Sequence, residues 1–459
     1  MPRRNTTRRS YLKWVGAGGA TGLAGCASGG GGGDGADTTT ESGGGDTAAS
    51  TTGGTTTTVS GRGGTVHFLN DRSARDVWEN AAEEFSSQSD YEVDITWLPK
   101  GTTSNEQVAK MRAAGNLPAL IFESSTDCYR ETKEGITTPL TGVVEELGVK
   151  DVVPVDGDSY MVPAVAIPLI MTYRTDVVQG DPRTRSEWMA EAQRIKDDEG
   201  MSGYVVPSGR TNAATTHANQ TLWNGGVDPY AGSGEGIEVL LDQGENREKA
   251  VKSYEWLQEM DGYGPKASGW GWGDLMGALI QEQLVAWAGL GGLAILELQA
   301  NRPEIASNFV PAPYPRVEGT TPTQWWSYFE GMYSYADAEN TEGAKEFLKF
   351  FMTSDYYFEF LRQTALFNFP TSRSGLDDER YSEAEVIQQF PGFLDLVKEN
   401  WDDMAPVLQT GDDRSPNIIA ANAYGQQLYG QSIDRMLYGD DSAGEAVDWL
   451  AEQLRTEMS

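Results

Sequence analysis

The amino-acid sequence predicts an α/β protein that is organised into two lobes. From residue 65 to residue 122, segments with strand periodicity alternate with segments of helical periodicity. This βαβαβ order is typical of a mainly parallel sheet whose strands are joined by crossover helices. The chain after residue 64 is also too long for one ordinary hydrophobic core, so we expect two domains or lobes.

The alternation can be followed in order along the chain. Val66 and Phe68 indicate a first strand, and alternating apolar side chains predict a half-buried strand over 91–97. Val108 and Met111 indicate a second helix, and the apolar run 119–122 indicates a third strand. The first helix is expected over 74–87, because one helical face collects Val77, Trp78, Ala81, Ala82 and Phe85. Later amphipathic helices are expected over 187–198, 247–260, 341–352 and 443–456, and a further helix should end at the glycines 225–226.

The first 26 residues carry the features of an export signal. A basic stretch from Arg3 to Lys13 precedes an apolar segment, 14–24, that is too short to span a bilayer. The pair Arg8 and Arg9 resembles a twin-arginine export signal, and Leu-Ala-Gly-Cys at 23–26 resembles a lipobox. We therefore predict that 1–26 are an export signal with a lipobox, that Cys26 is lipidated, and that the protein is anchored at the extracellular face of the membrane.

The segment that follows, residues 27–64, is predicted to be a disordered tether. It consists almost entirely of Gly, Thr, Ser, Ala and Asp and has no apolar period. Such a segment cannot bury enough apolar surface to fold, and it would let a globular body move over the membrane to which it is attached.

The chain is strongly acidic. Asp and Glu number 68 against 35 Lys and Arg, which gives a formal charge of −33, and loss of the five basic residues in 1–25 brings the charge near −38. A surface of this sign repels polyanions, so nucleic acid is not expected as a partner. The composition resembles that of proteins from extreme halophiles, in which concentrated salt screens self-repulsion.

This charge leads to a prediction about salt. The folded part should loosen or unfold when salt is lowered from molar concentration to about 0.1 M, because the Debye length then grows to about 10 Å and the acidic groups repel one another more strongly. Circular dichroism and thermal melting in a salt series measure the effect. An unchanged spectrum and melting temperature across that range would remove the halophilic interpretation.

The few cysteines and histidines exclude several site types. With Cys26 assigned to lipid, Cys128 is left alone, so no disulfide framework is possible. Cys128 is expected to be a buried, inert thiol, and with only His67 and His217 a zinc site is not expected. The acidic triplet 156–158 is expected to form a turn rather than a calcium site. We predict no metal.

No cofactor is predicted either. Gly289, Gly291 and Ala294 match the spacing of a dinucleotide fingerprint, but a lone match late in an exported chain is weak evidence. A tight turn, or a close approach of backbone to a ligand, explains these glycines more simply.

Several segments, in this order along the chain, resemble one known family. They are 76–85 with 93–99, 117–122, 160–165 with 172–176, 309–315, 343–350 and 444–447. The family is the extracellular solute-binding proteins of ABC importers, specifically the sugar-binding group typified by maltose-binding protein. The resemblance implies a two-lobed periplasmic-binding-protein-like fold with a ligand cleft between the lobes. It also implies a sugar ligand, the permease subunits of an ABC transporter as partners, no enzymatic activity, and a monomer.

The resemblance also implies domain boundaries and shows two departures. Lobe 1 is expected to comprise 65–165 and 331–370, and lobe 2 to comprise 166–330 and 371–459. The family often has an acidic residue shortly after the first crossing segment, where this chain has Ile-Pro-Leu at 167–169. It often has an aromatic residue at a later position, which is Leu293 here. The ligand contacts are therefore expected to differ from those of the family, and the identity of the sugar stays open.

Candidate contacts follow from the chemistry that a sugar requires. Its apolar faces need aromatic side chains, and its hydroxyl groups need carboxylates, amides and arginine. The candidates on the lobe 1 side are Asn70, Asp71, Arg72, Glu123 and Ser124. Those on the lobe 2 side, where 325–330 are expected to precede the second crossing segment, are Arg210, Asn212, Trp270, Trp272, Trp325, Trp326, Tyr328 and Glu330. The tryptophans expected in the core instead are Trp78, Trp188, Trp223 and Trp256.

Two alternatives remain open at this point. A surface-anchored glycan hydrolase would share the export signal, the tether and an aromatic cleft, and would need two carboxylates about 5–10 Å apart. The same binding fold could instead take a polyol phosphate, for which excess basic residues would line the cleft, or a polyamine, for which carboxylates and aromatic rings would do so.

Overall fold

The computed structural model describes residues 63–70, 74–98, 104–232, 236–320, 322, 324–410 and 415–457. The predicted export signal with Cys26, the tether as far as residue 62, and the predicted contacts Asp71 and Arg72 lie outside the described residues. The first strand begins at Gly64, so the last residue assigned to the tether belongs to the fold.

The predicted alternation of strands and helices is confirmed in the first half of lobe 1. Strand β1 (Gly64–Asn70) pairs in parallel with β2 (Tyr91–Trp97) along its whole length and with β3 (Leu120–Ser124) on its other side. Helices α2 (Arg75–Gln88) and α3 (Ser104–Ala113) make the crossovers. The buried face of α2 is the predicted one, Val77, Trp78, Ala81, Ala82 and Phe85.

Short elements complete this region. They are α4 (Ser125–Lys133), β4 (Thr137–Thr138), α5 (Thr141–Leu147), β5 (Pro154–Val155) and β6 (Asp158–Ser159). Strands β5 and β6 form a hairpin whose two turn residues, Asp156 and Gly157, both have positive φ. This is the backbone of a tight two-residue hairpin turn, as expected for the acidic triplet.

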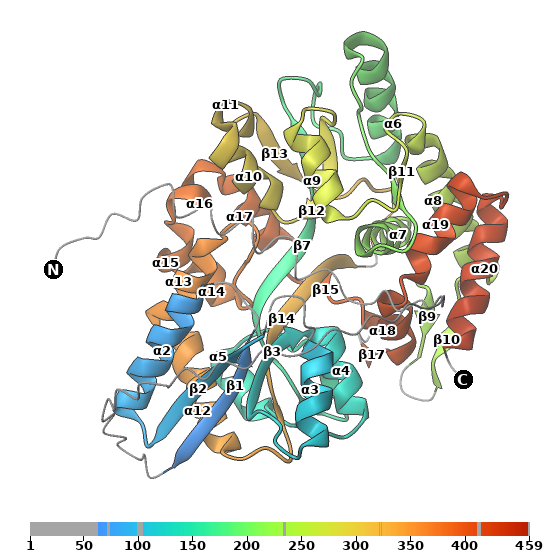
Figure 1. The fold of residues 1–459 in the computed structure, drawn as a ribbon. Coiled ribbons are helices and arrows are strands. Elements are labelled where there is room, and N and C mark those ends of the chain that lie inside the picture. Colours follow the sequence, from blue (N-terminus) through green and yellow to red (C-terminus); the bar gives the residue numbers. More distant parts are fainter. Residues whose placement is uncertain are drawn as a thin grey trace, which may run out of the picture.

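Two long strands connect the lobes (Figure 1). Strand β7 (Val162–Arg174) is buried along all 13 residues, and β14 (Trp325–Tyr335) runs antiparallel to it. The sheet order is β12-β7-β14-β3-β1-β2, and β12 (Ala286–Leu290) and β13 (Phe309–Ala312) both pair antiparallel with β7. The expectation of a mainly parallel sheet is therefore wrong beyond β3. The reason is that the alternation of strands and helices, from which a parallel sheet was expected, ends at β3. The helices that follow reverse the direction of the chain before the later strands.

Lobe 2 surrounds a buried helix, α7, which is packed by α19 and α8 (Figure 1). The elements between β7 and β14, besides β12 and β13, are α6 (Arg185–Arg194), the π-helix η1 (Ile195–Glu199), β8 (Pro207–Ser208), α7 (Asn212–Asn224), β9 (Tyr230–Ala231), β10 (Glu238–Val239), α8 (Gly244–Asp261), β11 (Ala267–Ser268), α9 (Trp272–Ile280), α10 (Leu293–Asn301) and α11 (Pro303–Ala306). The C-terminal helices are α18 (Ile418–Gly425), α19 (Leu428–Tyr438) and α20 (Ala443–Thr456).

After β14 the chain returns to lobe 1 and then crosses again. Helices α12 (Thr341–Thr353) and α13 (Asp355–Gln363) pack against α2, while α17 packs against β13. The remaining elements are α14 (Arg373–Asp377), α15 (Glu379–Ser382), α16 (Glu385–Gln389), α17 (Pro391–Glu399), β15 (Met404–Ala405), β16 (Gln409–Thr410) and β17 (Ser415–Pro416). The domain boundaries given above stay a prediction.

The structure places the expected core residues inside. The four tryptophans predicted for the core are buried, and so is Cys128, whose thiol pKa is raised well above its usual value by that burial. Gly291 lies in the turn between β12 and α10 with φ +49°, and a Cβ there would meet the carbonyl oxygen of Leu366 at 2.4 Å. Gly291 is therefore required by a tight turn and by the close approach of another backbone segment.

Two features are absent from the described residues. None of the helices in that part of the chain is both long and apolar enough to cross a bilayer. Within the same residues, no group of three or more His, Cys, Asp or Glu side chains is placed to hold a metal ion.

Candidate functional site

The candidate site begins where two parallel strands of lobe 2 end. Strands β8 and β11 pair side by side, and each is followed within a few residues by a helix, α7 or α9. The Thr211 side chain caps α7 by accepting from the backbone N–H of Ala214, and its hydroxyl also donates to the carbonyl of Trp270 at 3.0 Å. The starts of both helices are thus held together, which brings Asn212 close to Trp272.

The Asn212 amide links three elements of lobe 2 to the crossing strand. Its oxygen accepts from the Trp272 indole N–H at 3.3 Å and from the Thr216 hydroxyl at 3.4 Å. Its nitrogen donates to the hydroxyl of Tyr328 on β14. The Tyr424 hydroxyl lies 2.8 Å from the amide oxygen and has one proton, which it donates either to Asn212 or to Tyr328. We call Asn212, Trp272, Trp326, Tyr328 and Tyr424 the aromatic cluster.

The Tyr328 hydroxyl is the most connected group of the aromatic cluster. It accepts from the Asn212 amide and lies 2.8 Å from the Tyr424 hydroxyl, which can donate its single proton to Tyr328 or to Asn212. A hydroxyl oxygen has two acceptor positions and one proton. When both neighbours donate to it, the Tyr328 proton is left to be donated to a further acceptor. Burial, aided by the carboxylates of Glu330 and Glu123, raises the pKa of Tyr328 to about 12, so this proton is retained at neutral pH.

Strand β14 places alternate side chains on opposite faces. Trp326, Tyr328 and Glu330 share one face. The Trp326 ring lies edge-on to the Tyr328 ring, with the ring centres 4.5 Å apart, and it stacks on the Tyr424 ring, with the ring centres 6.0 Å apart. Trp325 lies on the other face and donates its indole N–H to the carbonyl of Leu169 on β7 at 2.7 Å. Residues 325–330 therefore form the first half of the crossing strand itself, and the expectation that they precede it is wrong.

Lobe 1 contributes carboxylates beside this face. Glu330 lies opposite Ser124 in the β14–β3 register, and Glu123 is adjacent. The Ser124 hydroxyl caps helix α4 by accepting from the N–H of Asp127. Glu123 accepts from the backbone N–H of Ser124 at 2.9 Å and from the hydroxyl of Ser104, which fixes the orientation of the carboxylate.

The predicted contacts thus fall into three groups, and their roles in binding stay predictions. Those that lie together around the aromatic cluster are Asn212, Trp272, Trp326, Tyr328, Glu123, Ser124 and Glu330. Asn70 is fully buried at the end of β1, Trp325 is buried on the opposite face of β14, Trp270 is partly buried, and Arg210 is exposed at the turn before α7. Asp71 and Arg72, as stated, lie outside the described residues.

Sequence reasoning missed two members of the hydrogen-bond network. Thr216 lies one helical turn after Asn212 on α7, at a spacing that could have revealed it once Asn212 was chosen. Tyr424 belongs to α18, a short apolar helix 212 residues away from Asn212 in the chain. No local pattern marks Tyr424 as a site residue.

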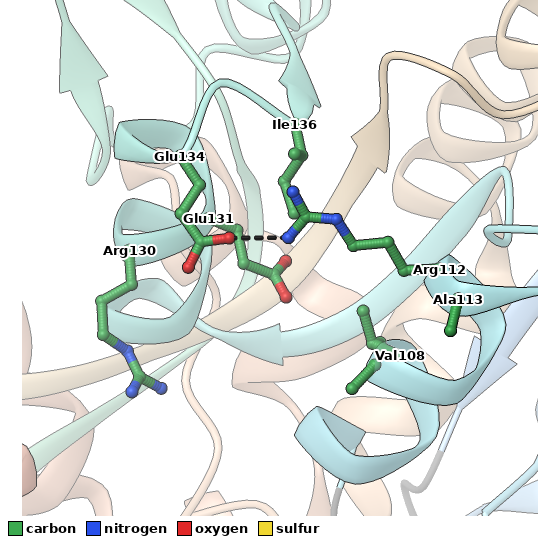
Figure 2. Close-up of a pocket in the computed structure, with 8 residues that line it drawn as sticks. Val108, Arg112, Ala113, Arg130, Glu131, Glu134 and Ile136 are labelled. Carbon is green, nitrogen blue, oxygen red and sulfur yellow. Dashed lines mark hydrogen bonds and ion pairs between the residues drawn. The ribbon is translucent and has the colours of Figure 1, made fainter. Parts of the chain in front are cut away.

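A separate groove of about 420 Å³ lies between α3 and α4, at the opposite end of α4 from Ser124 (Figure 2). Arg112 crosses it to bind Glu134 at 2.8 Å, and Glu131 accepts from the hydroxyls of Tyr333 and Tyr335 at 2.7 and 2.8 Å. Burial raises the pKa of Glu131. Because these charged groups already have partners within lobe 1, we assign no ligand to the groove.

The family model described as bacterial extracellular solute-binding protein matches residues 72–357, which is more than half of the chain. The chain belongs to this family. The family comprises extracellular solute-binding proteins, and the matched part of this solute-binding protein runs from the residues just after β1 to α13. A search of curated proteins found no match.

Solved structures agree with the fold. The sugar-binding protein MalE of Xanthomonas citri superimposes with a TM-score of 0.68 at 16% identity, covering 86% of this chain and 97% of that chain. A maltose-bound MalE3 of T. maritima gives 0.64 at 17% identity, covering 86% and 99%. A solute-binding protein of an ABC transporter from Thermotoga lettingae, bound with α-D-tagatose, gives 0.65 at 16% identity, covering 86% and 100%. At these identities the likeness establishes the fold alone.

Proposed function

We propose that this solute-binding protein captures a neutral sugar between its lobes and delivers it to the permease of an ABC importer. The observation that carries the proposal is the Tyr328 hydroxyl. It is held by Asn212 and Tyr424, is free to donate its own proton when Tyr424 donates to it, and lies on the strand that joins the lobes. Its neighbours are the aromatic rings of Trp326 and Tyr424, and the carboxylates of Glu123 and Glu330 are near enough to raise its pKa. Such a combination suits a ligand with many hydroxyl groups and apolar C–H faces.

The charges around Tyr328 bear on the alternatives. The groups that raise its pKa by their charge are carboxylates, which disfavours a polyol phosphate because like charges would be brought together. A polyamine would be attracted by these carboxylates and remains a second candidate. Membership of a solute-binding family favours binding over the glycan-hydrolase alternative.

A ligand screen in molar salt tests this proposal. Maltose, maltotriose, α-D-tagatose, ribitol, glucose 6-phosphate and spermidine are added to the protein, and the thermal midpoint is followed. A ligand that binds only the folded protein raises the midpoint, by an amount that corresponds to about 2.7 kcal/mol at a concentration 100 times Kd. Calorimetry then measures the affinity of each hit. Stabilisation by spermidine alone would replace the sugar by a polyamine, and cleavage of an oligosaccharide would favour the hydrolase.

The anchor is a separate prediction. We expect the mature protein to begin at a lipidated Cys26 and to fractionate with membranes, since the lipobox resemblance marks this cysteine for modification. Intact-mass analysis of the purified protein and fractionation of a Cys26→Ser variant measure this. Wild-type protein that is recovered in the soluble fraction with residues 1–25 still present would contradict it.

A further inference from the structure

Residues 401–410 and 415–417, which we call the return segment, lead from α17 to α18 within the part of the chain that is assigned to lobe 2. Its strand β15 pairs in parallel with the start of β14, so that Ala405 lies beside Trp326 of the aromatic cluster. Its last residue, Asn417, caps helix α18 by accepting from the backbone N–H groups of Ile419 and Ala420. The return segment therefore lies against the candidate site at one end and leads directly into α18 at the other.

Three hydrogen bonds attach the return segment to lobe 1. The ammonium group of Lys150 donates to the backbone carbonyl of Trp401 at 2.7 Å. The side chain of Gln409 donates to the backbone carbonyl of Asp151 at 3.1 Å. The hydroxyl of Tyr129, on helix α4, donates to the backbone carbonyl of Pro416 at 3.2 Å. Both Gln409 and Tyr129 are buried, with 4% of their surface exposed. These bonds join lobe 1 to a part of the chain that is assigned to lobe 2, so they depend on how the lobes are placed.

Helix α18 brings these contacts and the candidate site onto one rigid element. It has eight residues and is therefore about 12 Å long. Pro416, held by lobe 1, lies just before its first turn, and Tyr424 in its last turn belongs to the aromatic cluster. The helix also packs on α19 and α20 of lobe 2 and against α4 of lobe 1. A displacement of α18 would therefore change its contacts with both lobes at the same time.

We infer that the return segment and α18 form a strap that holds the lobes together and couples occupation of the aromatic cluster to the position of lobe 1, with Tyr129 as the positioning residue. The coupling to a ligand rests on the proposed function. The hydrogen bond from Tyr129 to Pro416 exists only when the lobes are close, so it favours the closed arrangement without contributing to the fold of either lobe. A ligand held between the lobes leaves only when they separate.

The test compares Tyr129→Phe with a matched control. Phenylalanine keeps the buried ring and removes only the hydroxyl. The control is Tyr356→Phe, which removes a hydroxyl that donates to Glu84 at 2.8 Å within lobe 1, away from the strap. Both changes are made in a Cys26→Ser background that carries fluorophores on exposed positions of the two lobes, Ser87→Cys and Glu452→Cys. Single-molecule energy transfer then reports the distance between the lobes, with no ligand and with maltose or α-D-tagatose.

We expect Tyr129→Phe to raise the ratio of open to closed molecules about twofold to tenfold without ligand, because one net hydrogen bond is lost. Tyr356→Phe should leave that ratio unchanged. If maltose or α-D-tagatose binds, its dissociation should be faster by a similar factor in Tyr129→Phe. Should Tyr129→Phe fail to fold, Gln409→Met tests the same strap at its second attachment.

The outcomes separate the strap from the proposed function. A wild-type distribution of lobe distances in Tyr129→Phe and in Gln409→Met overturns the strap, whatever sugar binds. A shifted distribution together with no sugar binding supports the strap and contradicts the proposed function. The coupling through α18 is tested by adding Tyr424→Phe to Tyr129→Phe. If the change in the ratio of open to closed molecules in the double variant equals the product of the changes in the two single variants, α18 does not connect the two contacts.

Discussion

An Asn212→Leu variant is expected to bind its sugar about 100-fold more weakly than the wild-type protein, a change of about 2.7 kcal/mol. Leucine keeps the volume of the side chain but removes an amide that contacts Tyr328, Tyr424, Trp272 and Thr216. Each of these hydrogen bonds contributes about 0.5–1.5 kcal/mol. Without them the Tyr328 hydroxyl loses its fixed orientation, and its proton is no longer aimed at the ligand.

Calorimetry with the sugar found in the screen measures this loss, and thermal melting in molar salt monitors the fold. The control is Asn301→Leu, because Asn301 is exposed on lobe 2 and its amide only donates back to Glu297 of its own helix. Asn301→Leu should bind as the wild type does. If Asn212→Leu also keeps wild-type affinity while melting normally, the aromatic cluster is not the ligand site.

The sequence was sufficient for the first half of lobe 1 because its signals are local. The face of α2 and the alternation of β2 follow from neighbours within one or two turns of the chain, and both agree with the structure. Strand direction beyond β3 is different. All 13 residues of β7 are buried, so its sequence has no alternation that would reveal which neighbour lies on which side. The partners of β7 are fixed by contacts with β12, β13 and β14, which lie more than a hundred residues away.

The candidate site was partly predictable for a related reason. Asn212 and Trp272 follow the ends of two strands, where ligands of α/β proteins are commonly bound, and position alone selects them. Trp325 and Trp326 are adjacent in the sequence. Because side chains alternate between the two faces of β14, only Trp326 joins the aromatic cluster. Tyr424 could not be found, since its role depends on hydrogen bonds to Asn212 and Thr216 of α7, which lies in a distant part of the chain.

Trp78 is the residue whose loss should cost lobe 1 most stability. Its side chain is fully buried, and its ring stacks on Phe351 with the ring centres 3.8 Å apart and the planes inclined by 14°. Further aromatic contacts of Trp78 reach Phe68 on β1, Phe122 on β3 and Phe360 on α13. The tryptophan thus joins α2 and the parallel strands to α12 and α13, which come from a separate stretch of the chain.

Trp78→Ala is expected to lower the free energy of unfolding by about 3–5 kcal/mol, because the cavity left by a buried tryptophan is only partly refilled. The indole N–H of Trp78 has no hydrogen-bond partner among the described residues, so Trp78→Phe should cost clearly less. Denaturant titrations in molar salt measure both changes. The control is Trp97→Ala on the edge strand β2, where the side chain is only partly buried and contacts Glu79 and Arg75, and where about 1 kcal/mol or less is expected. Equal losses for Trp78→Ala and Trp97→Ala would mean that the aromatic core around Trp78 does not hold the two stretches of lobe 1 together.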